Sequence, residues 1–225
     1  MHESPRGAGE GLGSPVPPFR NRRLLAGRGR YVADLRVPGC LHAAFLRSPL
    51  GHARIVRIDV EAARNMPGVE AVFTGADIAA ACSGYRGATA AFPGLRAPLQ
   101  HPMALEKAMW NGEPVVLVVA DSRARAEDAC ARVQVEWEEL PALTDPRAAL
   151  SAPPIHDDLP DNRVLQLAQR SDDVESVFAR AAHVVECEFS FNRHTGVPME
   201  TRGVLAEFEP FERRLTVHIS HQCRS

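Results

Sequence analysis

An unbroken apolar run, Pro114–Ala120, constrains the fold of this chain more than any other feature of its sequence. Such a run is typical of a strand that is buried on both faces of a sheet. Asp121 or Ser122 is placed to cap a helix through Arg132, and Val133–Trp137 then alternates apolar and polar residues like a returning strand. This order of signals predicts a βαβ unit with a right-handed crossover, and with it an α/β fold.

Strand and helix signals also alternate in the preceding part of the chain. Leu41–Leu46 and Ala53–Asp59 have the length and composition of short strands. Asp59 can cap a short helix over Glu61–Asn65. Val69–Phe73 then predicts a strand that completes a second βαβ-like unit.

Segments rich in glycine and proline divide the chain. Residues 1–21 are predicted to form a disordered tail, because they cannot bury enough apolar surface to offset the entropy of ordering. Three glycines and three prolines within residues 83–105 predict a long loop. Five further prolines between residues 141 and 161 predict a linker, over residues 146–160, to a second domain.

The part beyond the linker predicts one helix and three strands. The helix is expected over Asp172–Ala181. His183–Phe191 alternates cleanly between apolar and polar residues, as a half-buried strand does. Val204–Phe208 and Leu215–Ile219 predict two more strands, joined as a meander.

Composition narrows the class of protein. The chain has 225 residues, 45% of them hydrophobic and 24% charged, which is the range of ordinary globular proteins. Its net charge of -2 gives no argument for binding nucleic acid or an anionic membrane. No apolar run approaches the ~20 residues of a membrane span, and no signal peptide is evident. We expect a cytoplasmic protein without a membrane span.

The cysteines and histidines do not form a recognisable metal motif. The five cysteines are far apart and include no CxxC pair, so we expect reduced, mostly buried thiols. No HxH or HExxH occurs among the nine histidines. His218 and His221 are three residues apart near a predicted strand, which points them to opposite faces. No residue is therefore assigned a catalytic or metal-binding role.

Several polar motifs have simple structural interpretations. The pair Gly27 and Gly29 lacks the rest of a phosphate-binding loop and is interpreted as a turn. The acidic pairs Asp157–Asp158 and Glu138–Glu139 are expected at turns, as solvated charge. Glu200 lies in an apolar neighbourhood, where a structural pairing with Arg202 or with backbone amides is favoured over a catalytic role.

A series of motifs, in this order, resembles the large, molybdenum-cofactor subunit of the xanthine dehydrogenase, aldehyde oxidase and carbon monoxide dehydrogenase family. The resemblance extends over about nine tenths of the chain, and the ordered combination is more specific than any one motif. The motifs are Arg23–Asp34, Leu41–Pro49, His52–Ile55, Pro67–Val69, Thr74–Asp77, Asn111–Val116, Ala126–Ala129, Trp137, Glu139–Pro141, Arg193–Glu200 and Arg202–Val204.

The resemblance implies a fold and an activity. Residues 22–145 resemble the α/β hammerhead domain, with a mixed sheet and packed helices, and residues 161–225 resemble the first strands of the molybdopterin-binding domain. The implied activity is an oxidoreductase reaction of the aldehyde, purine or CO type, with molybdenum–molybdopterin as cofactor. The implied partners are iron–sulfur and FAD subunits or domains and the remainder of the large subunit.

One cofactor-binding residue follows from the resemblance. In the family, a glutamine after the strand matching Leu215–Ile219 lies beside the oxo ligand of the molybdenum centre, and Gln222 occupies that position here. Its amide can donate a hydrogen bond without adding charge. An ordinary glutamine at a strand end is the alternative.

The sequence departs from the family pattern after Gln222, where it reads Cys223-Arg224-Ser225 instead of a proline-containing loop. The glycine-rich cofactor loops and the catalytic glutamate of the family have no counterpart in the 225 residues. The first hypothesis is therefore an N-terminal fragment of a large subunit, inactive alone and without stably bound cofactor. The alternative is a non-catalytic binding or assembly module that docks on partner subunits.

Overall fold

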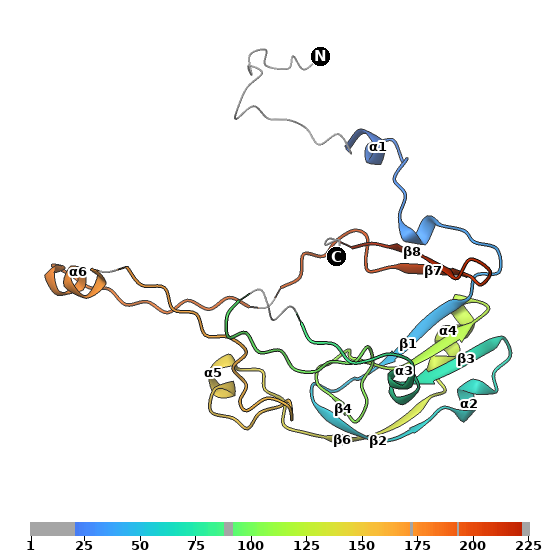
Figure 1. The fold of residues 1–225 in the computed structure, drawn as a ribbon, viewed down its shortest axis with the longest axis horizontal. Coiled ribbons are helices and arrows are strands. Elements are labelled where there is room, and N and C mark those ends of the chain that lie inside the picture. The colour runs from blue at the N-terminus through green and yellow to red at the C-terminus, as the bar shows by residue number, and fades with distance from the viewer. Residues whose placement is uncertain (1–20, 88–91, 172, 193, 222–225) are drawn as a thin grey trace, which may run out of the picture. The chain divides into compact units, whose positions relative to one another are not determined.

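The computed structural model describes residues 21–87, 92–171, 173–192 and 194–221. The chain divides into two compact units (Figure 1). The larger unit is Pro38–Glu186, and the smaller one combines Met1–Val37 with Cys187–Ser225. The predicted disordered tail falls almost wholly outside the described residues.

The first sheet of the larger unit is built around the predicted buried strand. That strand, β5 (Pro114–Ala120), lies between β1 (His42–Arg47) and β3 (Val69–Thr74), and both neighbours run antiparallel to it. Val115, Val116 and Val118 of β5 are fully buried, as the apolar run predicts.

The second sheet of the larger unit also has three strands. Its central strand, β2 (Ala53–Asp59), pairs antiparallel with β4 (Lys107–Ala108) on one side and β6 (Gln134–Glu139) on the other. Ile55 lies opposite Trp137 in the register of β2 and β6, and both side chains pack against the core of the unit.

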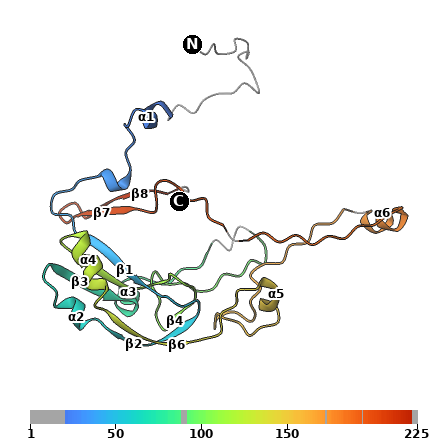
Figure 2. The same cartoon turned by 180° about the vertical axis from the view of Figure 1, so that it is seen from behind.

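Two helices form where the sequence predicts them. They are α2 (Glu61–Arg64), after β2, and α4 (Arg123–Cys130), after β5. Ser122 caps α4 through its side chain, which accepts a hydrogen bond from the backbone of Arg125. Helix α4 packs on β1 and β5 (Figure 1 and Figure 2), and its buried alanines, Ala126 and Ala129, permit the close approach.

The predicted βαβ crossovers are wrong. The strands that flank α4 belong to different sheets, and so do those that flank α2. Every strand pair among the described residues is antiparallel. Strand β5 already has a partner along each edge, so β6 pairs with β2 instead. A run of strand, helix and strand indicates the elements but not their pairing. The α/β class with packed helices is confirmed.

Helix α3 (Gly75–Ala81) was not expected from the sequence. It starts with a capping box in which the backbone N–H of Thr74 donates to the Asp77 carboxylate at 2.7 Å, and the Thr74 hydroxyl accepts from the Asp77 backbone. The Thr74 backbone bond holds the pKa of Asp77 below its usual range. The spacing of these two residues was the signal that identifies the helix start.

Residues 146–186 complete the larger unit with two short helices, α5 (Pro146–Ala149) and α6 (Val174–Arg180). Helix α6 confirms the predicted helix, while α5 lies within the predicted linker. Asn162 holds this region together: its amide donates to the carbonyl groups of Ala149, Ala152 and Pro153. Its side-chain oxygen accepts a hydrogen bond from the backbone of Ile155. The linker residues are therefore packed in a hydrogen-bonded turn.

The smaller unit contains α1 (Asn21–Leu25), the 3-10 helix η1 (Val32–Asp34) and a hairpin of β7 (Val204–Glu209) and β8 (Arg214–Ile219). The hairpin confirms the last two predicted strands, and Gly27 lies in a turn with φ of 66°, as interpreted.

The predicted strand His183–Phe191 is wrong: these residues are in neither strand nor helix. An alternating pattern becomes a strand only where a neighbour supplies hydrogen bonds, and no described strand pairs with this segment.

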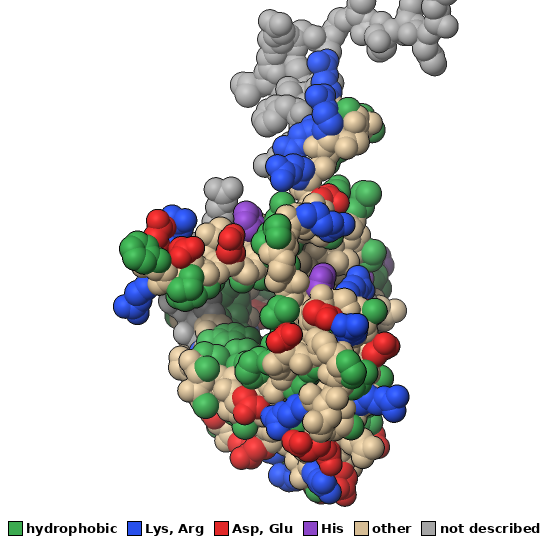
Figure 3. Space-filling view, turned by 90° about the vertical axis from the view of Figure 1, so that its right-hand side faces the viewer, with side chains coloured by type: hydrophobic (Ala, Val, Ile, Leu, Met, Phe, Trp, Pro, Cys, Tyr) green, Lys and Arg blue, Asp and Glu red, His purple; other side chains and the backbone are tan. Residues whose placement is uncertain are grey.

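The surface of the chain carries charges of both signs. On the face drawn in Figure 3, Lys and Arg side chains are interspersed with Asp and Glu side chains. Several of them form exposed ion pairs, such as Arg54 with Glu138 at 2.9 Å and Arg123 with Glu127 at 2.7 Å. No helix in the described part of the chain is long and apolar enough to cross a membrane.

The close contact between Gly75, at the start of α3, and the backbone of Ala104 can be tested by substitution. A Cβ atom at this position would lie 1.9 Å from the carbonyl oxygen of Ala104. Gly75→Ala is therefore expected to lower the free energy of unfolding by about 1–3 kcal/mol through overpacking, measured by urea denaturation of the 225-residue chain. In the control Gly87→Ala, the new Cβ would meet its nearest neighbour at an ordinary 3.8 Å. Equal losses in both variants would contradict this account.

Candidate functional site

The predicted cofactor-binding residue Gln222 lies outside the described residues, but hydrogen bonds hold Ser220, two residues before it. Strand β8 ends at Ile219, and the Ser220 hydroxyl donates to the carbonyl of Thr201 at 3.0 Å. The same hydroxyl accepts from the backbone N–H of Gly203 at 3.2 Å, and the Ser220 N–H donates to the Gly203 carbonyl at 3.2 Å. Three hydrogen bonds therefore fix the position at which the chain leaves the hairpin.

A cavity of about 420 Å³ lies beside Ser220 in the smaller unit. Residues 30–32, Leu35, Glu200 and the end of β8 line it. The Glu200 carboxylate accepts a hydrogen bond from the Val32 backbone N–H at 2.9 Å, which confirms the predicted pairing of Glu200 with a backbone amide. Glu200 therefore ties the hairpin to the 3-10 helix η1.

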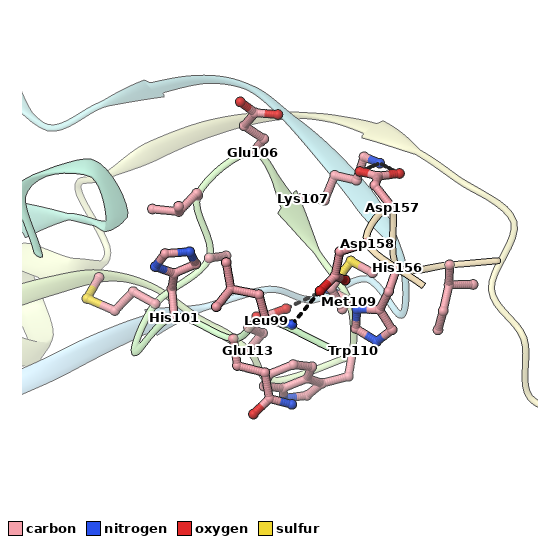
Figure 4. A pocket seen from close by; sticks show the side chains of 15 residues that line it. Leu99, His101, Glu106, Lys107, Met109, Trp110, Glu113, His156, Asp157 and Asp158 are labelled. Atoms are coloured by element: carbon pink, nitrogen blue, oxygen red, sulfur yellow. Dashed lines mark hydrogen bonds and ion pairs between the residues drawn. The ribbon is translucent and has the colours of Figure 1, made fainter. Parts of the chain in front are cut away.

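A second cavity, of about 280 Å³, lies within the larger unit between residues 99–113 and residues 155–158 (Figure 4). Lys107, the only lysine of the sequence, forms an ion pair with Asp157 at 2.6 Å. Asp158 pairs with Arg86 at 2.7 Å and accepts the backbone N–H of Leu99 at 2.9 Å. Asp157 and Asp158 lie in a turn, as expected, but their charges attach the 155–158 segment to the rest of the unit.

Glu113, which lines this cavity, is a buried carboxylate that the sequence analysis did not identify. It is 6% exposed, and it accepts a hydrogen bond from the Met109 backbone at 2.5 Å. Burial raises the pKa of Glu113, because the charged form loses its hydration, although the bonds from the Met109 and Trp110 backbones oppose this shift. The one signal in the sequence that could have identified this buried carboxylate is an acidic residue immediately before an apolar strand.

Two histidines contribute nitrogen atoms to this cavity. His101 Nδ1 is buried and has no hydrogen-bond partner, and burial lowers the pKa of His156. His101 and His156 project from different segments (Figure 4). No group of three or more potential metal ligands occurs among the described residues. The cavity thus presents two imidazoles and anchored carboxylates, and it lies where several segments of the larger unit pack together.

The other polar predictions are corrected in part. Glu138 and Glu139 lie in β6, not at a turn, because the strand extends beyond Trp137 and Glu138 pairs with Arg54 of β2.

The four described cysteines are free. Only Cys130 of these four is buried, so the expectation of mostly buried thiols is wrong. Cys82, in the larger unit, and Cys187, in the smaller unit, are both exposed.

Comparison with known proteins identifies the family. Residues 26–141 match the family model for the a/b hammerhead domain of aldehyde oxidase and xanthine dehydrogenase. The chain belongs to this family. Residues 155–225 match the model for the molybdopterin cofactor-binding domain, so the two matches follow one another in the order that the sequence motifs predict. The resemblance stated from the motifs is therefore confirmed.

The relatives of this family member are much longer than the chain itself. It is 43% identical over 212 residues to the nicotine 6-hydroxylase large subunit of Paenarthrobacter nicotinovorans, covering 94% of this chain and 26% of the relative. It is 33% identical to the carbon monoxide dehydrogenase large chain of Hydrogenophaga pseudoflava, covering 89% of this chain and 26% of the relative. The chain thus spans about a quarter of the curated relatives it matches.

Solved structures agree with the sequence comparisons. The crystal structure of quinoline 2-oxidoreductase from Pseudomonas putida 86 superposes with a TM-score of 0.83 at 43% identity. The match covers 91% of this chain and 26% of that one. The family member therefore shares its fold with about a quarter of that oxidoreductase chain.

Glu113 predicts a pH dependence of stability. Because its folded-state pKa is raised, the native chain binds this proton more tightly than the unfolded chain. The protonated Glu113 side chain contributes its full stabilisation of the folded chain below the ordinary carboxyl pKa of about 4.3. This stabilisation is lost as the pH rises through the pKa that Glu113 has in the folded chain. The Glu113→Gln variant has no carboxyl group to titrate at this position, so it does not lose this stabilisation. The unfolding free energy of the variant minus that of the parent chain should therefore increase between pH 4 and pH 7. Urea denaturation across that range checks the trend, and a constant difference would contradict it.

Proposed function

We propose that this chain is the N-terminal part of a molybdenum-cofactor-dependent oxidoreductase that acts as a hydroxylase or dehydrogenase of the aldehyde, purine or CO type. The observation that carries the proposal is the succession of a hammerhead match and a molybdopterin cofactor-binding match along one chain. The first-named relatives are a hydroxylase and dehydrogenases, which supports the reaction class.

The described residues fit the approach to a cofactor at the end of β8. The cavity beside Ser220 is adjacent to the position from which Gln222 follows, and hydrogen bonds hold that position. Gln222 would donate its amide N–H to the cofactor, a bond that orients the group without adding charge. Bound molybdenum–molybdopterin would supply the redox chemistry. Ser220 would keep the Gln222 backbone in place.

The proposal extends to partners and location. The names of the relatives designate subunits of larger assemblies, namely a large subunit, a complex subunit and a large chain. We therefore include iron–sulfur and FAD subunits, and the remainder of the large subunit, as partners. A cytoplasmic location is also part of the proposal, and the four described free cysteines agree with a reducing compartment.

The 225 residues by themselves are proposed to be inactive and to bind no cofactor stably. They align with 26% of the nicotine 6-hydroxylase large subunit, and the rest of that relative has no counterpart in them.

A chimaera tests the proposed function. In the nicotine 6-hydroxylase large subunit, the 212-residue matching region is replaced by this chain and the protein is produced with that enzyme's other subunits. We expect the purified chimaera to contain molybdenum and to oxidise nicotine. A folded, assembled chimaera without molybdenum would contradict the proposal and would favour the alternative, a non-catalytic assembly module.

Gln222 is tested in the same chimaera. Gln222→Ala is expected to lower kcat about 10- to 100-fold, the usual effect of removing a group that orients a metal ligand. The control is Gln169→Ala, which changes an exposed glutamine of the larger unit and should leave kcat unchanged. Unaltered turnover in the Gln222 variant would identify it as an ordinary strand-end residue.

A further inference from the structure

Glu113 is a buried carboxylate that forms no ion pair with any described residue. It is 6% exposed, and the groups that bond to it are the backbone N–H groups of Met109 and Trp110. Buried charged groups in proteins are usually paired with an opposite charge, because burial removes their hydration. The raised pKa of Glu113 has this cause. Glu113 therefore lacks the opposite charge that would stabilise its ionised form.

Two other carboxylates that line the 280 Å³ cavity differ from Glu113, because each already has a cation. Asp157 pairs with Lys107 at 2.6 Å, and Asp158 pairs with Arg86 at 2.7 Å. Neither cation is paired with Glu113. An occupant of the cavity can therefore supply the positive charge that the protein does not place beside Glu113.

The remaining walls of the cavity suit a ligand with an apolar body (Figure 4). Met103, Met109 and the ring of Trp110 provide apolar surface, and an aromatic ring also attracts cations. His101 Nδ1 is buried without a partner, and an imidazole nitrogen in this state can accept a hydrogen bond from an N–H group. Apolar walls with a few convergent polar groups are typical of small-molecule sites.

We propose that this cavity binds a small organic cation, namely a protonated amine with an apolar body. The ammonium group donates hydrogen bonds to the Glu113 carboxylate and to His101 Nδ1, and the apolar body packs against Trp110. Every residue that lines the cavity belongs to the larger unit, so the site does not depend on the proposed molybdenum chemistry. Further chain or another subunit packed on this unit can only increase the burial of Glu113.

Two probes of the same shape test the charge of the ligand. Benzylammonium carries the positive charge, and benzyl alcohol replaces the ammonium group by a neutral hydroxyl. Isothermal titration calorimetry with the 225-residue chain measures both affinities. We expect saturable binding of benzylammonium, and binding of benzyl alcohol that is weaker by about tenfold or more, because a hydrogen bond to a charged group is stronger than a neutral one. Equal affinities, or no binding of benzylammonium, would overturn the inference.

Variants locate the binding site. Glu113→Gln keeps the size of the side chain and removes its charge, so it should weaken benzylammonium binding by about tenfold or more and leave benzyl alcohol binding unchanged. The control Glu70→Gln removes an exposed charge of β3 and should change binding by less than about twofold. Trp110→Leu changes a residue that is 44% exposed, so the chain should still fold, and it should weaken benzylammonium binding by about threefold or more. Parent-like binding in the Glu113 or the Trp110 variant would place the ligand elsewhere and overturn the inference.

The same titration in the chimaera shows whether the cavity stays available in a complete large subunit. We expect benzylammonium binding there that is weakened by Glu113→Gln as in the 225-residue chain. Binding by the chain alone, with none that depends on Glu113 in the chimaera, would mean that another part of the subunit fills the cavity, and it would overturn the inference. A molybdenum-free chimaera that binds benzylammonium through Glu113 would contradict the proposed function and leave the cation site standing.

Discussion

Burial of β5 is the constraint on which the larger unit depends. Its three fully buried valines need cover on both faces and a partner strand on each edge. Strands β1 and β3 satisfy its edges, and helix α4 covers one face through small side chains. Once β5 is enclosed in this way, β6 has to find its partner in the second sheet, and the fold of two antiparallel sheets follows.

Polar anchors then attach the irregular segments to this core. Glu113 accepts a hydrogen bond from the Met109 backbone. Lys107 and Arg86 form ion pairs with the acidic turn at residues 157–158. Exposed ion pairs contribute little stability singly, so their effect here is to select one position for a loop that carries few apolar residues. In the smaller unit, Glu200 and Ser220 do the same for the segment that leads to Gln222.

The positions of the helices and strands were predicted better than the pairing of the strands. Strands β1, β2, β3, β5, β7 and β8 and helices α2, α4 and α6 lie where local patterns indicated. The crossovers and the strand over residues 183–191 failed for one reason: strand pairing depends on which edges meet in space, which periodicity does not record. Of the site, the role of Glu200 was predicted. The Lys107 pair was missed because the fold alone brings Asp157 close to it, and Glu113 was missed because its burial depends on the packing of the segments around it.

By itself the sequence determined the family, the two successive domain types, most secondary structure and the candidate glutamine, because motifs and periodicity are local properties of a chain. Only the tertiary structure decided that all described strand pairs are antiparallel and that the carboxylate immediately before β5 is buried. It also showed that six apolar side chains of the hairpin share one side. These outcomes depend on distances between residues far apart along the chain, where burial and hydrogen bonding compete for the same partners.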